Sequence, residues 1–500
     1  MKRRIIILLL VLAIVFTLTA CNKKKSGDDV EITVAFHLLP NGLEPLSEDS
    51  VQNFAIVYHV YDRLVTFDPL TNAWGPAVAK SWERVDDVTW KFEIDLRYKF
   101  QNGDQLTMDD VVYSLLRLRD IPKTADSGNL IQSVTYEGST LTFVTVNAAN
   151  TIPSRVLSTA VIVQKKYVEN GGDDAIYLNP IGTGPYKVTE FTPGASATIE
   201  AWDGYPFDMP QITKINYIAI AENAARYIAL ETGQCQYAHF LTAYEIDLAE
   251  QNDSLATISV MSRRANCWCF NCEQPPFDNI NVRRAIIYAF DRAAFCSLQG
   301  GRPPIVSMLF AGYDDLYVES ANMPHFDLEI ARQMLAAEGY DESNPLRFEL
   351  FGYQADPGHE LFQSSLKSIG VEMSINMVEF SVFLAAEGSG GFDLINTTQI
   401  NRGNHPLMDL DRYDINMLGM RDISRYYNPR VQELVEAMRT ENDPARLRAM
   451  NIEINDILAQ EVPMVGTMLQ PIFAAVDKNL TGVVIDPGQI ASFRGCTYTG

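Results

Sequence analysis

Three cysteines lie within six residues, at Cys267, Cys269 and Cys272 in the sequence CWCFNC. Thiolates at such spacings can hold a zinc ion or an iron–sulfur cluster, or form a redox centre. Alternation along a strand, however, puts Cys267 and Cys269 on one face and Cys272 on the other face with Trp268 and Phe270. We therefore expect free, buried thiols that pack as small apolar groups. One or two disulfides, or a metal site, are the alternatives.

Sequence signatures of catalysis are absent. The sequence contains no His-Glu-x-x-His, no Gly-x-Ser-x-Gly and no Gly-x-x-x-x-Gly-Lys-[Ser/Thr], which are the signatures of zinc proteases, α/β-hydrolases and P-loop proteins. Its six histidines include no pair at metal-ligand spacing, and the run around His59 is typical of packing. We predict no enzyme activity, no cofactor and no directly ligated metal.

The N-terminal residues predict export and a lipid anchor. A basic start precedes the apolar run Ile5–Phe16 and then Leu-Thr-Ala-Cys at 18–21, which is typical of a signal peptide. The last four residues resemble the lipobox of bacterial lipoproteins. The resemblance implies a signal peptide over residues 1–20, lipid on Cys21, and a polar tether over residues 21–29. An uncleaved anchor or a plain secreted protein is the alternative.

Composition narrows the range of partners. The 500 residues are 47% hydrophobic and 21% charged, with a net charge of −23. Such an acidic surface repels nucleic acid and acidic lipid headgroups. No second apolar run of about 18 residues follows the first, so we expect the rest of the chain to lie outside the membrane. Its length predicts two or three domains.

Helical and strand periods alternate along the chain, which predicts a mixed α/β fold. Residues 89–96 alternate as a half-buried strand, and a capping box begins at Thr107. Residues 282–296 carry apolar side chains at helical spacing, which predicts one continuous buried stripe. Asn428 and Asp443 each precede a proline, the pattern of a helix start.

Five blocks in order resemble one family across nearly the whole chain. That family is the extracellular solute-binding proteins of peptide and nickel ABC importers. The similar blocks are residues 60–118, NPIGTGPYKVTEF at 179–191, residues 221–238, CFNCEQPPFDNINVRRAIIYAFDR at 269–292, and residues 426–465.

The resemblance implies a two-lobed periplasmic-binding-protein-like fold with an inserted domain and a hinged ligand cleft. The implied first lobe is residues 30–59, 180–264 and 475–500, with residues 60–179 as the inserted domain. The implied second lobe is residues 265–474. It further implies a monomer, anchored on the outer face of the cell membrane or in the periplasm, that delivers a solute to an ABC permease and its ATPase.

Ligand contacts are expected where strands end at the lobe interface. Three segments qualify from this rule and the family: His37–Asn41, Cys267–Phe270 and Thr397–Tyr413. Within them, the predicted ligand-binding residues are His37, Leu38, Trp268, Phe270, Arg402, Asn404 and His405. The alternatives are a solvated charge for Arg402, a turn residue for His405 and plain core packing for Trp268.

The third segment departs from the family. Peptide-binding members usually carry Asp-Tyr-Pro-Asp-Pro here, and the Asp captures the peptide's α-amino group. This chain reads Gly-Asn-His-Pro-Leu at 403–407, although Asp409 or Asp411 could substitute. A peptide remains the expected solute, with a sugar, an opine or a metal chelate as alternatives. A surface receptor that senses a solute without importing it is the other functional class.

Overall fold

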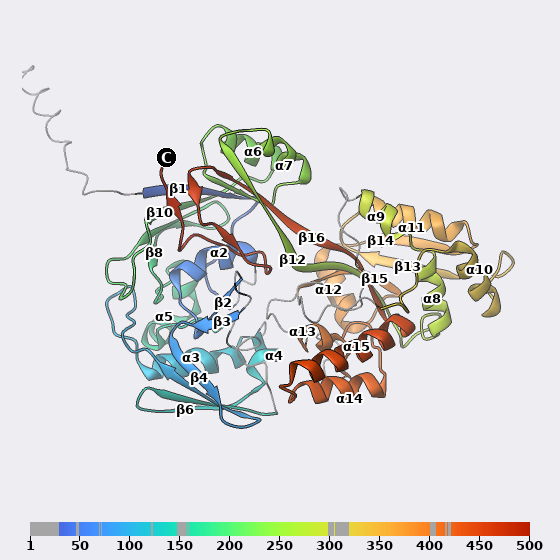
Figure 1. Ribbon diagram of the computed structural model, residues 1–500, viewed down its shortest axis with the longest axis horizontal. Coiled ribbons are helices and arrows are strands. Elements are labelled where there is room, and N and C mark those ends of the chain that lie inside the picture. Colours follow the sequence, from blue (N-terminus) through green and yellow to red (C-terminus); the bar gives the residue numbers. More distant parts are fainter. Residues whose placement is uncertain are drawn as a thin grey trace, which may run out of the picture.

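The computed structural model describes residues 30–46, 50–69, 71, 73–121, 124–147, 157, 160–298, 305, 320–400, 407–415, 418 and 422–500. The predicted signal peptide (1–20), Cys21 and the tether (21–29) lie outside these residues. Two lobes lie side by side and are joined by two long strands, β12 and β16 (Figure 1). Within the described ranges, no helix is both long enough and apolar enough to span a bilayer.

One ten-stranded sheet runs through both lobes. In spatial order its strands are β14 (Glu372–Met377), β13 (Arg347–Gly352), β15 (Leu394–Ile400), β12 (Leu255–Phe270), β16 (Met464–Asp477), β11 (Tyr237–His239), β1 (Val30–Phe36), β10 (Ile212–Ala219), β9 (Ser196–Ala201) and β8 (Tyr186–Thr192). The antiparallel pair β12 and β16 passes from one lobe to the other. A two-lobed α/β architecture is thus confirmed.

The first lobe packs helices and the C-terminal segment onto strands β8–β11 and β1. The helices are α2 (Val51–Val60), α5 (Lys165–Leu178), α6 (Asn223–Glu231) and α7 (Ala243–Glu250). Short strand pairs complete it: β2 (Val65–Asp68) with β3 (Ala73–Pro76), β17 (Leu480–Thr481) with β20 (Thr497–Tyr498), and β18 (Val484–Ile485) with β19 (Ala491–Ser492). Phe493 of the last segment lies in the same core cluster as Phe36 and Tyr217.

The segment predicted to be the inserted domain lies below the first lobe in Figure 1 and has its own four-stranded sheet and core. Its strands are β4 (Ala79–Arg84), β5 (Thr89–Ile94), β7 (Thr140–Thr145) and β6 (Ile131–Glu137), with helices α3 (Met108–Leu116) and α4 (Ala125–Gly128). The predicted capping box is confirmed: Asp110 N donates to Thr107 Oγ1 at 3.3 Å, and Thr107 N donates to Asp110 Oδ2 at 2.9 Å. Trp90, Phe92 and Ile94 are buried as the alternation predicts.

Helices cover both faces of the sheet in the second lobe. Its helices are α8 (Ile280–Tyr288), α9 (Arg292–Leu298), α10 (Leu328–Ala337), α11 (Pro357–Lys367), α12 (Phe380–Ser389), α13 (Leu407–Leu410), α14 (Pro429–Met438) and α15 (Pro444–Glu461). Helices α8 to α11 pack with one face of β12, whereas α12, α14 and α15 pack with the other. Asn428 and Asp443 are the N-caps of α14 and α15, as predicted.

The predicted continuous stripe over residues 282–296 is wrong in one respect. The segment forms two helices, α8 and α9, because Asp291 starts a new helix by accepting a hydrogen bond from Ala294 N at 2.9 Å. The resulting change of direction leaves Ala293 exposed and buries Phe295 instead. A helical period alone cannot reveal such a break.

Candidate ligand-binding site

The directions of the strands place the carboxyl ends of both half-sheets opposite each other. Strand β12 enters the second lobe, and β16 runs antiparallel to it, back into the first lobe. Strand β11 is antiparallel to β16, and β1 and β10 run in the same direction as β11. These three strands therefore end toward the second lobe. Strand β15 is antiparallel to β12, with β13 and β14 parallel to it, so these end toward the first lobe. Ligands of open α/β sheets bind at such ends, which places a candidate site between the lobes.

His37 and Leu38 lie on the first-lobe side of this interface, directly after β1. The His37 ring lies 5.2 Å from the ring of Phe240, which follows β11, and His37 Nε2 lies 3.5 Å from Gln52 Nε2. Burial, and then the charge of Arg226, lowers the pKa of His37. Leu38 is 45% exposed. A neutral imidazole and an apolar side chain are thus available at this edge.

Trp268 and Phe270 are instead buried in the core of the second lobe, each with 0% of its surface exposed. The Trp268 ring lies 4.3 Å from Phe362 and 4.4 Å from Phe290, and the Phe270 ring lies 4.7 Å from Phe277. Packing against helices α8 to α11 accounts for both side chains. Their contact with a ligand stays a prediction, since neither presents any surface in this structure.

The predicted contacts Arg402, Asn404 and His405 lie outside the described residues, so their roles stay predictions. The structure does describe Asp409 and Asp411, the two residues that could substitute for the Asp of the family motif. Asp409 is buried and lies 2.8 Å from Arg412, whereas Asp411 Oδ1 lies 3.4 Å from Arg439. Both carboxylates are therefore engaged in ion pairs inside the second lobe.

Helix α12 supplies an apolar surface that the sequence reasoning missed. It begins at Phe380, three residues after the end of β14 at Met377, so its first turn lies at the interface edge. Phe380 is 54% exposed and Leu384 is 47% exposed. Tyr353, just after β13, places its ring 5.0 Å from that of Phe380. The sequence feature that could have revealed this surface is a helix with apolar residues on every side. Such a helix at the surface of a protein implies that something covers its apolar side chains.

A cavity of about 420 Å³ lies in the first lobe between the end of α2, the β2–β3 pair and the C-terminal segment. Its wall includes the ion pair between Asp62 Oδ1 and Arg494 Nη1, 2.7 Å apart. Tyr98 and Tyr205 also line it, and burial, ahead of the neighbouring Asp62 carboxylate, raises the pKa of each phenol. Burial likewise raises the pKa of the lining Asp486. The cavity wall is therefore polar and aromatic.

The crossing strands contain an interruption between the lobes. The pairing of β12 with β16 is broken between Met261 and Ala265. Within this break, Arg263 N donates to Pro487 O at 2.8 Å, and Arg264 N donates to Ser262 Oγ at 3.1 Å. Arg263 thereby ties the break to the loop that carries Asp486. A short unpaired segment in two crossing strands is where a hinge can absorb rotation.

The cysteines form packing rather than a reactive centre. Cys267 and Cys269 lie in the core on one face of β12, opposite Trp268 and Phe270, as alternation predicts. Both are free, as is Cys272. Burial raises the pKa of Cys267 and of Cys272 to about 12, and the pKa of Cys269 well above its usual value. In the part of the chain that the structure describes, no three His, Cys, Asp or Glu side chains gather as metal ligands.

Comparison with known proteins gave a family match and similar relatives. Residues 73–415 match the family described as "Bacterial extracellular solute-binding proteins, family 5 Middle". Di/tripeptide-binding protein 2 of Pseudomonas aeruginosa is 23% identical, covering 92% of this chain and 94% of its own. The glutathione-binding protein GsiB of Escherichia coli K12 is 25% identical, covering 90% and 91%. A dipeptide-binding protein of Pseudoalteromonas sp. SM9913, solved with Met-Leu, superposes with a TM-score of 0.80 at 19% identity, covering 94% of this chain and all of that one.

Proposed function

The chain belongs to the bacterial extracellular solute-binding proteins of family 5, and from this premise we propose that it captures a peptide between its lobes and delivers it to an ABC importer. The family is one of binding proteins and not of enzymes. The single observation that carries the proposal is the convergence of strand ends from both lobes on a two-strand hinge. Closure around a solute would convert occupancy into a shape that a permease can recognise.

The chemistry of the two walls supports a short peptide as the solute. A peptide combines a polar backbone with side chains that are often apolar. The first lobe offers tyrosines and an ion pair whose Asp62 carboxylate is buried, and the second offers Phe380, Leu384 and Tyr353. Relatives named for di- and tripeptides and for glutathione are similar over nearly their whole length. The chain lacks the Asp-Tyr-Pro-Asp-Pro motif, so we expect the amino end of its peptide to be bound by groups other than the Asp that peptide-binding members use.

The anchor is a separate part of the proposal. The sequence Leu-Thr-Ala-Cys after an apolar run supports lipid on Cys21 and attachment to the outer face of the cell membrane. A Cys21→Ser variant is expected to appear in the soluble fraction of cells, whereas the unaltered protein stays with membranes until detergent is added. Equal partition of the two would contradict the anchor without affecting the binding function.

The binding function is tested by identifying what the protein carries. The full chain is purified gently in mild detergent and measured by native mass spectrometry, then denatured to release bound molecules. Peptides of varied sequence are the expected result, and their mass difference should vanish after denaturation. A single non-peptide mass would overturn the peptide assignment. A variant in which Tyr244 of α7 is replaced by Ala serves as the control, since that side chain is exposed.

Import is distinguished from sensing by a second measurement. Cells that lack the gene are expected to lose uptake of a radiolabelled form of the recovered peptide. Normal uptake, together with an altered transcriptional response to the peptide, would instead favour the receptor that senses without importing.

A further inference from the structure

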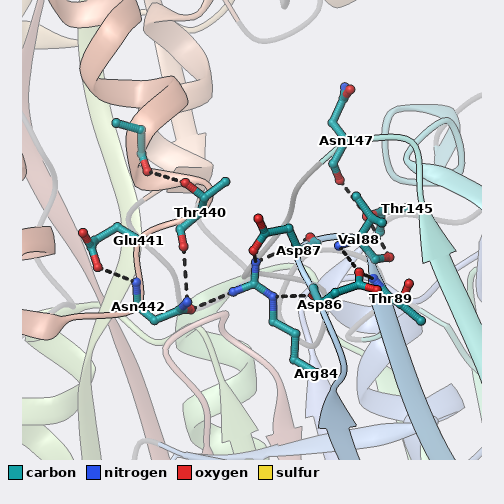
Figure 2. Close-up of polar contacts among 11 residues, drawn as sticks. Arg84, Asp86, Asp87, Val88, Thr89, Thr145, Asn147, Thr440, Glu441 and Asn442 are labelled. Atoms are coloured by element: carbon teal, nitrogen blue, oxygen red, sulfur yellow. Dashed lines mark hydrogen bonds and ion pairs between the residues drawn. The ribbon is translucent and has the colours of Figure 1, made fainter.

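Arg84 and Asn442 join the inserted domain to the second lobe at a point remote from the hinge. Arg84 ends strand β4, and Asn442 lies in the turn between α14 and α15. Arg84 Nη1 donates to Asn442 Oδ1 at 2.9 Å, although 358 positions separate the two residues (Figure 2). The crossing strands lie in the upper half of Figure 1, whereas β4 and α14 lie in the lower half. The lobes are therefore in contact at both ends of their interface.

Arg84 is held in place by its own turn. Its Nε donates to Asp86 O at 3.0 Å, and its Nη2 donates to Asp87 Oδ1 at 3.0 Å. The turn is fixed by Asp86 Oδ1, which accepts from Val88 N at 2.9 Å and from Thr89 N at 2.8 Å. These contacts leave Nη1 directed at the second lobe (Figure 2), and the side chain is only 15% exposed. The guanidinium is thus positioned before its partner arrives.

Asn442 is similarly oriented by its neighbours. Its backbone N donates to Glu441 Oε1 at 2.9 Å, and its Nδ2 donates to Thr440 O at 3.2 Å. This use of the amide nitrogen directs the Oδ1 acceptor toward Arg84 (Figure 2). Because both groups are already ordered, little side-chain freedom is lost when they meet. A charged donor also makes a stronger hydrogen bond than a neutral one.

We propose that Arg84 and Asn442 form a latch that holds the two lobes together opposite the hinge. Rotation at the break between Met261 and Ala265 separates the two side chains, so the bond exists only in the closed arrangement. Neither residue lines the first-lobe cavity. The latch therefore changes the ratio of closed to open protein without touching the solute, and it slows release of whatever the lobes enclose.

The test measures the lobe separation directly. Spin labels are attached in the full chain at Thr135→Cys on β6 and Glu433→Cys on α14, which flank the latch and are exposed. The distance distribution is measured by double electron–electron resonance with no peptide added. Arg84→Gln and Asn442→Ala are each expected to lower the ratio of short to long distances by about threefold to tenfold. Asn442→Asp, which offers a carboxylate to the guanidinium, should raise it.

Coupling between the two residues decides the interpretation. The double variant Arg84→Gln/Asn442→Ala should lower the ratio no further than either single variant, because one bond is lost in all three. Arg347→Gln, which removes an exposed arginine pair with Glu372 inside the second lobe, is the matched control and should leave the distances unchanged. Unchanged distances in both single variants, or additive effects in the double variant, would overturn the latch. Because no peptide is used, this result is independent of the proposed solute.

Discussion

The cavity of the first lobe and the exposed apolar surface of the second lobe differ in chemistry. The cavity of the first lobe holds the Asp62–Arg494 ion pair beside Tyr98 and Tyr205. The second-lobe side exposes Phe380, Leu384 and their neighbour Tyr353. Fixed charges with pre-set geometry orient a polar group, whereas an apolar surface gains free energy only when it is covered. For the solute proposed above, the first lobe would therefore supply orientation and the second would supply apolar contact.

Breaking the first-lobe ion pair should cause the largest loss of stability. Arg494→Met leaves Asp62, whose side chain is only 5% exposed, with an uncompensated charge. We expect the free energy of unfolding to fall by about 3–5 kcal/mol, measured by urea denaturation. In Arg347→Met the lost pair with Glu372 is exposed on both sides, so a change of about 0–1 kcal/mol is expected. Equal losses in the two variants would mean that the first-lobe pair is not buried in solution.

Trp268→Ala should cause a similar loss of stability in the second lobe, because it leaves a large cavity among Phe290, Phe295 and Phe362. The expected loss is about 3–5 kcal/mol, with most of it recovered in Trp268→Phe. Thermal unfolding of both variants is the measurement. Nearly unchanged stability together with lost peptide binding would show that Trp268 contacts the ligand, as the sequence first indicated.

Acidification should change stability through buried groups that act in opposite directions. The ring of His59 is neutral in the first lobe, since its Nδ1 donates to Ala55 O at 2.9 Å and its Nε2 accepts from Phe493 N at 2.9 Å. Burial, followed by nearby charges, lowers the pKa values of His59 and His239 to about 3 from 6.5. The unfolded chain therefore takes up protons first as the pH falls below 6.5, and stability is lost. Between pH 7 and pH 5 the two rings together should remove about 4 kcal/mol.

Asp422 in the second lobe opposes this loss. Burial raises its pKa to about 6 from 3.8, so the folded state holds the proton more tightly and gains about 1 kcal/mol between pH 7 and pH 5. Urea denaturation at both pH values checks the signs. His59→Gln should reduce the acid sensitivity, and Asp422→Asn should increase it. The reverse pattern would mean that the rings are exposed or charged at neutral pH.

Phe380→Ala should have the smallest effect, on affinity alone. With a peptide recovered from the purified protein as the probe in isothermal titration calorimetry, we expect binding about tenfold weaker, which corresponds to the loss of one partly buried aromatic contact. Stability should hardly change, because the side chain is already 54% exposed. Tyr244→Ala on α7, 67% exposed, is the matched control and should bind normally. If both variants bind like the unaltered protein, the apolar side of the interface lies outside the ligand's reach.

The sequence predicted local features and the family well, and long-range pairs not at all. Helix caps at Thr107, Asn428 and Asp443 depend on adjacent residues and are confirmed. Alternation correctly separated the faces of β12. It could not tell that helices cover both faces, because that depends on chain segments as distant as α15 (Pro444–Glu461). The Asp62–Arg494 and Arg84–Asn442 contacts join residues 432 and 358 positions apart, which no local pattern can reveal.

The route of the chain through β12 and β16 also orders events during synthesis. All strands of the second lobe, including the start of β16, are made before the chain returns to the first lobe. The first lobe cannot complete its sheet before β16 is made, because β16 lies between β11 and β12. Asp62 likewise lacks its Arg494 partner until the C-terminal segment is made. A chain that emerges N-terminus first therefore completes the second lobe first. The main sheet of the first lobe is begun earliest and completed last, which leaves it most in need of protection from aggregation and proteolysis until the C-terminal segment arrives.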